Sequence, residues 1–447
     1  MKIALFAVLL SFFASPGRVF AQIQGVDEWA EALVLGLTPH WAGQRVPHPV
    51  VVSRPAESGA YTSSTFESIR VHGLADSSEA DLRDVLAIVE QSAIALRAEG
   101  WGVPAEDGGL GGSTEFDLYL ADLGDQGYQI NSDGTLLWPH LDSDSGFAIV
   151  ERSLAGRDLV ACVTAAYAES VMLGLDPAEA PAWRRATAAY LTYQLTGSFG
   201  CHEEEVLAGV ARAYESAIPD VVRVAEGRDA APAGYFIGLL DAQQRNGDGS
   251  FIRDMWQLTR QRTWEGSDLR GSPDLWMAIE TTLGFNEHKL PEIIEQLSVA
   301  RYLAGTTGAP TLGDRALPHV EPIWIGNVQF ADLPEHFPVA NPPIETYGQG
   351  FALVHTPNVP ANTRLRVWMH GEFRVEWDLI VVPLDRNKHE ITRIAAPPRR
   401  TPRSYLEVLL PANTDRVLIA VTNMSHRLPD ADIPDENARS FELIVDR

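Results

Sequence analysis

Two neighbouring segments decide the fold: LVACVTAAYAESVML at Leu159–Leu173 and PAWRRATAAYLTYQL at Pro181–Leu195. The second segment carries Trp183, Thr187 and Tyr190 at spacings of three or four residues, which place them on one face of a helix. Gly197 follows shortly after, as expected where a helix ends. We therefore predict two consecutive helices here.

The preceding region predicts a mixture of helix and strand. Ser78–Glu99 has apolar residues at helical spacing and begins with the capping pattern of Ser78 and Asp81. Phe116–Leu120 and Gly146–Val150 are expected to be strands, and the polar segment Asn131–Gly134 between them is expected to be a turn. From Glu203 to Ala304 the pattern is helical throughout, so this part of the chain is predicted to be α+β.

The character of the sequence changes after Leu317, where prolines cluster and the remaining apolar runs are short. Six runs separated by turn residues predict a β-sandwich of about one hundred residues. They are Phe351–His355, Leu365–His370, Trp377–Val382, Tyr405–Leu410, Val417–Thr422 and Phe441–Val445. The predicted organisation is a signal peptide at 1–21, a lead-in segment at 22–60, an α+β core with a helical lobe at 61–310, and an all-β sandwich domain at 318–447.

Composition and charge exclude several classes of protein. Hydrophobic residues make up 45% and charged residues 21% of the sequence, which is typical of a globular protein and excludes a disordered chain. Lys and Arg number 35 against 60 Asp and Glu, giving a formal charge of −25. Because nucleic acids bind by releasing counterions to clustered basic residues, we expect no nucleic-acid partner.

The N-terminus has the features of an export signal. Lys2 precedes the apolar run Ile3–Ala14, and Val19–Ala21 has small residues where a signal peptidase cleaves. We expect a periplasmic or extracellular protein without a membrane span. The two cysteines, Cys162 and Cys201, are then free to form a disulfide, and two buried thiols are the equal alternative.

The order of these elements resembles that of exported bacterial metallopeptidases of the gluzincin (thermolysin-like) type. Their helix after the edge strand carries the motif H-E-x-x-H, whose two histidines bind one zinc ion and whose glutamate is the general base. Here the corresponding segment, Thr164–Met172, reads TAAYAESVM and resembles that helix with both ligands removed. The segment Ala180–Tyr190 resembles the next helix, which supplies the third ligand, and segments of the helical lobe and of the β-module are also similar.

Carried over residue by residue, the resemblance implies a degenerate site. Ala168 and Met172 stand where the two histidines belong, Glu169 keeps the place of the general base, and Arg185 replaces the third ligand. An alanine has no donor atom, and a guanidinium repels Zn²⁺. We expect no cofactor and no peptidase activity, a binding or structural role with a protein or peptide as the ligand, and Glu169 paired with Arg185.

The alternative is an active zinc metallopeptidase with a non-standard ligand set. His202, Glu203 and Glu205 form the best local cluster of metal-ligating residues, although such a site needs further ligands from elsewhere in the fold. Asp142 and Asp144 are similar to the beginning of a calcium-binding loop. The sequence leaves these alternatives open.

Overall fold

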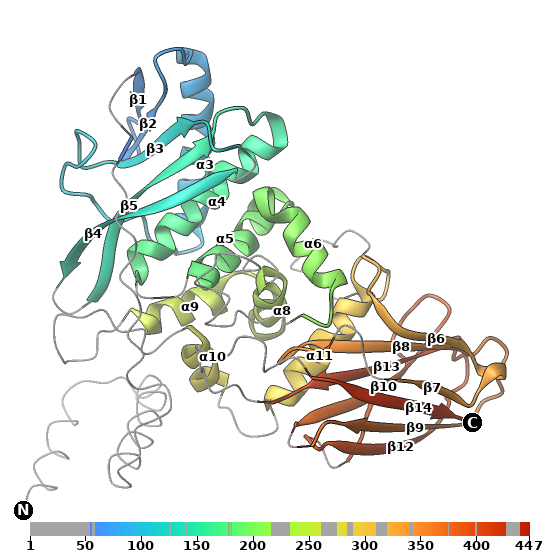
Figure 1. Ribbon diagram of the computed structural model, residues 1–447. Helices are drawn as coiled ribbons and strands as arrows, with labels where there is room; N and C mark the ends of the chain where they lie inside the picture. Colours follow the sequence, from blue (N-terminus) through green and yellow to red (C-terminus); the bar gives the residue numbers. More distant parts are fainter. Residues whose placement is uncertain are drawn as a thin grey trace, which may run out of the picture.

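The computed structural model describes residues 54–55, 59–124, 127–138, 141–177, 179, 181–215, 233–260, 275–283, 289–309, 320–338, 343–373, 375–397, 400–425 and 439–447. The predicted export signal and most of the lead-in segment lie outside these residues. Within them the chain is a mixed α/β protein with three β-sheets, and its C-terminal part is rich in strands (Figure 1).

The first sheet has five strands in the order β1-β2-β3-β5-β4. β2, β3 and β5 run parallel, whereas the edge strands β1 and β4 are antiparallel to their neighbours. The strands are β1 (Tyr61–Ser63), β2 (Ile69–His72), β3 (Phe116–Ala121), β4 (Tyr128–Trp138) and β5 (Leu141–Glu151). Both predicted strands, in β3 and β5, are confirmed. The predicted turn at Asn131–Gly134 is wrong, because this segment lies within β4.

Helices α3 (Glu79–Ala98) and α4 (Gly156–Leu175) pack on one face of this sheet. That face is apolar because alternate residues of the strands, such as Val71 and Leu118, point toward the helices and are fully buried. The predicted cap of α3 is confirmed, since the Ser78 hydroxyl accepts a hydrogen bond from the Asp81 N–H at 3.1 Å. Both helices predicted from the deciding segments are also confirmed.

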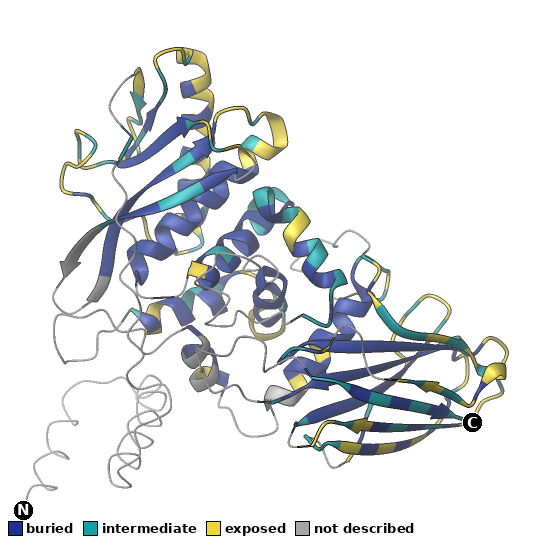
Figure 2. Ribbon diagram, viewed as in Figure 1, coloured by how far each residue is buried: buried dark blue, intermediate teal, exposed yellow. Residues whose placement is uncertain are grey.

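Helix α4 lies at the centre of the N-terminal part of the fold. It packs against the sheet, against α3 and against α5 (Pro181–Thr196), as Figure 1 shows. By length and composition α4 could cross a membrane, which the sequence analysis did not anticipate, but 83% of its most apolar window is buried inside the protein (Figure 2). Its apolar character is therefore that of a core helix.

The predicted helical lobe is built from short helices that follow α5. They are a 3-10 turn η2 (Gly200–His202), α6 (Glu203–Ala211), α8 (Ala233–Arg245), α9 (Ser250–Thr259), α10 (Leu275–Leu283) and α11 (Lys289–Leu303). Their buried side chains extend the same hydrophobic core that contains α3, α4 and α5.

The C-terminal part consists of two sheets, in the orders β11-β10-β13-β8-β6 and β12-β9-β14-β7. Their facing sides enclose a second hydrophobic core, as expected for a β-sandwich. All six predicted strands are present, as β8 (Gln349–His355), β9 (Arg364–Gly371), β10 (Trp377–Leu384), β12 (Arg403–Leu409), β13 (Arg416–Asn423) and β14 (Phe441–Asp446). The sequence analysis missed β6 (Trp324–Gln329), β7 (Glu335–Phe337) and β11 (Ile394–Ala395).

Helix α11 covers the outer face of the first of these sheets. Val299, Tyr302 and Leu303 of α11 share a third apolar cluster with strand residues including Phe351 and Leu418. On the same helix, Arg301 is only 1% exposed. Its guanidinium donates hydrogen bonds to Gln349 and to the carbonyl groups of Gly209, Arg212, Ala213 and Glu215. The helical part and the sandwich are thus joined by both apolar and polar contacts.

Candidate functional site

A disulfide fixes the position of the chain that follows α5. Cys162 in α4 is bonded to Cys201 in η2, with their Cα atoms 5.2 Å apart. Of the two alternatives that the sequence left equal, the structure has the disulfide. Since η2 leads directly into α6, the bond holds His202 and the first turn of α6 beside the helix that carries the metallopeptidase-like segment.

A hydrogen-bonded network of buried side chains lies at this junction. The Tyr128 hydroxyl, at the start of the edge strand β4, donates to the Glu169 carboxylate of α4 at 2.7 Å. His202 Nε2 is 2.8 Å from the same hydroxyl and so donates its proton to it. All three residues are at most 6% exposed. His202 Nδ1 lies 3.5 Å from the Glu205 carboxylate, which is largely exposed. The network thus leads from a buried carboxylate to the surface.

Arg185 of α5 supplies positive charge to the same network. Burial by itself lowers the pKa of its guanidinium, but the negative charges of Glu169 and Glu205 act in the opposite direction, and the net pKa is raised. The predicted association of Arg185 with Glu169 thus has an electrostatic basis in the structure. Tyr128 also donates a hydrogen bond to the Glu169 carboxylate, which the sequence analysis did not anticipate.

Burial and charge also change the acidity of the other members of the network. Complete burial, followed by the charge of Glu169, raises the pKa of the Tyr128 phenol well above its usual value, so it stays a proton donor. The interaction with His202 lowers the pKa of Glu205, and Arg185 acts in the same direction. Glu205 is therefore a carboxylate at neutral pH.

The positions that the resemblance assigns to zinc do not fit a zinc ion. Ala168 and Met172 are both 0% exposed and belong to the main hydrophobic core. Neither offers a nitrogen or oxygen donor, and Arg185 brings a positive charge to the third position. Among the described residues, no group of three or more His, Cys, Asp or Glu side chains is arranged to hold a metal ion.

The weaker metal candidates separate in the structure. His202 and Glu205 are neighbours, but the Glu203 carboxylate accepts a hydrogen bond from Ser198 and lies 3.6 Å from Arg157. The residues considered as a calcium loop, Asp142 and Asp144, belong to strand β5, so no loop is formed there.

The structure therefore combines two sets of residues that the sequence suggested separately. Glu169 and Arg185 came from the metallopeptidase resemblance, and His202 and Glu205 came from the local acidic cluster. Tyr128 joins them, and sequence reasoning missed it because its strand is too polar to be recognised. One feature of the sequence could have pointed to Tyr128. It lies in the segment between two predicted strands, where a mixed sheet can add an antiparallel edge strand.

Comparison with known proteins gives little further information about this chain. No family model matches it, and no curated protein matches it. A crystal structure of the pre-peptidase C-terminal domain of collagenase from Bacillus anthracis is similar over 28% of this chain and 98% of that domain, with 7% identity and a TM-score of 0.19. The enzymatically active domain of tailspike protein 4 from bacteriophage CBA120 is similar over 23% of this chain and 14% of that one, with 12% identity and a TM-score of 0.18. At these scores neither similarity supports a conclusion about function, and the gluzincin resemblance stays a prediction.

Proposed function

We propose that this protein is an exported, catalytically silent protein of the gluzincin metallopeptidase type that binds a protein or peptide ligand. The proposal rests on the interactions that surround the Glu169 carboxylate. Its carboxylate, in the place of the general base, is hydrogen-bonded to Tyr128 and lies in the field of Arg185.

Chemistry supports the loss of peptidase activity. A zinc peptidase needs a metal that both activates a water molecule and polarises the scissile carbonyl group. With Ala168 and Met172 in the ligand positions, Glu169 has no metal-bound water to deprotonate. Arg185 replaces the lost positive charge, and thereby stabilises a carboxylate that is costly to bury alone.

The edge strand β4 supports a peptide ligand. Among the described residues β4 pairs with β5 on one side and with no strand on the other. The Glu151 N–H donates to the Gly127 carbonyl, and the alternation of an antiparallel ladder then directs the N–H groups of Tyr128 and Ile130 away from β5. An extended peptide can add to such an edge as a further strand. Tyr128 would connect this bound strand to the buried network.

The loss of zinc is tested by elemental analysis of the purified mature protein. We expect no stoichiometric zinc and no chelator-sensitive proteolysis. Restoring all three ligands by Ala168→His, Met172→His and Arg185→Glu should give about one zinc per chain if the gluzincin geometry is correct. Zinc bound by the unmodified protein and lost in a His202→Ala variant would instead establish the alternative, an active site built around His202 and Glu205.

Peptide binding is tested by selection from a displayed library of random peptides. Selected peptides should bind the unmodified protein and the Ile130→Val variant equally. They should lose binding to Ile130→Pro, because proline removes one outward N–H group while leaving the ladder to β5 intact. Failure to enrich any peptide, or equal binding to both variants, would contradict strand addition at β4.

A further inference from the structure

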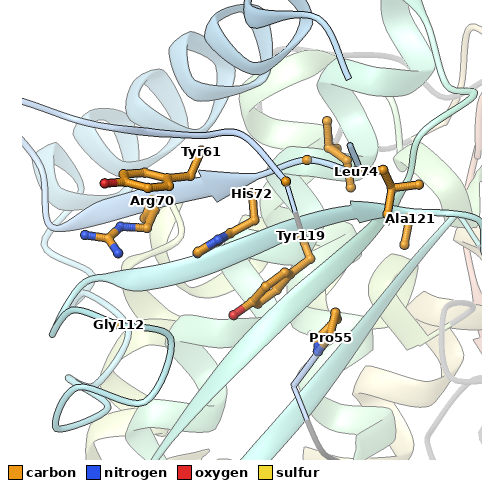
Figure 3. A pocket seen from close by; sticks show the side chains of 11 residues that line it. Pro55, Tyr61, Arg70, His72, Leu74, Gly112, Tyr119 and Ala121 are labelled. Carbon is orange, nitrogen blue, oxygen red and sulfur yellow. The ribbon is translucent and has the colours of Figure 1, made fainter. Parts of the chain in front are cut away.

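A cavity of about 490 Å³ lies on the first sheet, at a distance from the network around Glu169. Its volume is within the range of small-molecule binding sites. Figure 3 shows its polar and aromatic lining, which comes from Tyr61 of β1, Arg70 and His72 of β2, and Tyr119 of β3. The remaining lining residues are apolar or glycine.

Strand register explains why these side chains meet. Tyr61 is paired with His72, and His72 is paired with Tyr119, so the three side chains lie on the same face of the sheet. Val71 and Leu118, which alternate with them, belong to the core under α3 and α4. The cavity is therefore on the face opposite to these helices, and it is separate from the site that contains Glu169.

His72 is held rigidly by groups behind it. Its Nε2 atom is 2.7 Å from a carboxylate oxygen of the fully buried Asp117. Arg54 forms an ion pair with the other oxygen of this carboxylate, so the carboxylate oxygen facing the ring is placed to accept a hydrogen bond from the imidazole N–H. The His72 ring stacks on Tyr119 with centroids 4.4 Å apart. Within the described part of the chain Nδ1 makes no hydrogen bond, so it is available to a ligand as an acceptor.

The charges around the cavity favour a neutral ligand. Among the lining residues that the structure describes there is no carboxylate, and their one cation, Arg70, is paired with Glu115 at 2.8 Å. The Arg70 guanidinium also lies over the Tyr61 ring at 4.7 Å. An anion would have to compete with Glu115 for Arg70, and a cation would find no carboxylate among these described lining residues. Neither kind of charge is therefore selected.

The arrangement of the rings disfavours a flat aromatic ligand. The rings of Tyr61 and His72 are 6.2 Å apart and inclined by 42°. A planar ligand held between two rings needs about 7 Å and nearly parallel walls, because each contact requires about 3.5 Å. What the cavity offers is a set of hydrogen-bonding groups beside aromatic rings: the Nδ1 acceptor of His72, the N–H groups of Arg70, and the hydroxyl of Tyr61, which is 61% exposed.

We propose that this cavity binds a neutral sugar, with His72 Nδ1 accepting a hydrogen bond from a sugar hydroxyl and Tyr61 and Arg70 forming the rim. Neighbouring hydroxyl groups of a sugar can donate a hydrogen bond to the acceptor in this cavity and accept hydrogen bonds from its donors. The aromatic rings can pack against the apolar C–H face of the sugar ring. This inference does not depend on the proposed loss of peptidase activity.

The test is saturation-transfer NMR on the purified protein with a panel of neutral sugars, namely glucose, galactose, mannose, N-acetylglucosamine, maltose and cellobiose, followed by calorimetric titration. Glucuronate and glucosamine serve as the charged comparisons. We expect at least one neutral sugar to bind, and to bind more tightly than either charged sugar. Absence of binding by every neutral sugar at millimolar concentration, or tighter binding of a charged one, would overturn the proposal.

Substitutions of the lining residues test whether the sugar binds in this cavity. Tyr61→Ala and His72→Phe should each weaken binding by about tenfold, the effect of losing one or two hydrogen bonds. Tyr405→Ala is the matched control, because Tyr405 is an exposed tyrosine on the sandwich and should have no effect. If His72→Phe fails to fold, Tyr61→Ala still decides the matter, since Tyr61 is exposed. Unchanged binding in Tyr61→Ala would place the sugar elsewhere and overturn the proposal.

Discussion

Replacing Tyr128 with phenylalanine gives the sharpest test of the buried network. The substitution removes one hydroxyl group and leaves the ring, so the packing of the core is preserved. The hydroxyl donates to the Glu169 carboxylate at 2.7 Å and accepts from His202 at 2.8 Å. A hydrogen bond to a charged group contributes about 1.5–3 kcal/mol and a neutral one about 0.5–1.5 kcal/mol. We therefore expect Tyr128→Phe to lower the free energy of unfolding by about 2–4 kcal/mol.

Tyr235→Phe is the matched control for this measurement. Tyr235 is also a buried tyrosine, but its hydroxyl makes one hydrogen bond, to the Ala300 carbonyl at 2.9 Å. Its loss should cost only about 1 kcal/mol. Urea unfolding followed by circular dichroism measures both values, provided that the denaturant slopes are equal. If Tyr128→Phe destabilises no more than Tyr235→Phe does, the Tyr128 hydroxyl does not stabilise the network through Glu169 and His202, and the reasoning is wrong.

Three further predictions concern stability. Arg185→Ala should lower the free energy of unfolding by about 2 kcal/mol, because it leaves a buried carboxylate without its cation, whereas alanine at the exposed Arg403 should have little effect in the same urea titration. Replacing both cysteines with alanine should cost about 4 kcal/mol in the chain-entropy model for a separation of 39 residues, and mass spectrometry without reductant should find no alkylated thiol in the unmodified protein. Hydrogen bonds from Ser153 and from backbone N–H groups lower the pKa of Glu151 from 4.5 to about 2, so its stabilising effect is complete above pH 4.5 and is lost as the pH falls toward 2. Unfolding midpoints of Glu151→Gln should accordingly depend less on pH in this interval, and an unchanged pH dependence would contradict the assignment.

Much of the architecture could be predicted from local patterns. Helical periodicity and the cap at Ser78 placed α3, and the deciding segments placed α4 and α5, because these helices bury a continuous apolar face. Six strands of the sandwich were equally clear, whereas β6, β7 and β11 were missed. The edge strand β4 was not clear, because Asn131–Gly134 has the composition of a turn. Its extended form is imposed by pairing with β5, a long-range contact that a local pattern does not contain.

The residues of the candidate sites could also be predicted only in part. Glu169 and Arg185 could be named in advance because a motif fixes their spacing along adjacent helices. Tyr128 could not, because its relation to Glu169 depends on where β4 meets α4. The cavity at His72 was also missed, since three strands must align in register before Tyr61, His72 and Tyr119 face one another. Both sites thus depend on contacts between separate elements of the fold, which a local sequence pattern does not contain.

The position of Arg301 on α11 has a consequence for how the protein unfolds. This buried guanidinium draws its acceptors from the end of α6, from the residues after it and from β8, and α11 closes the apolar outer face of the sandwich. Detaching the sandwich would uncover that face and remove Gln349 from the acceptors of this buried charge, and burial has already lowered the pKa of Arg301 to about 10. The two parts of the chain therefore behave as one cooperative unit, and a sandwich cut away from α11 would be prone to self-association rather than an independent module.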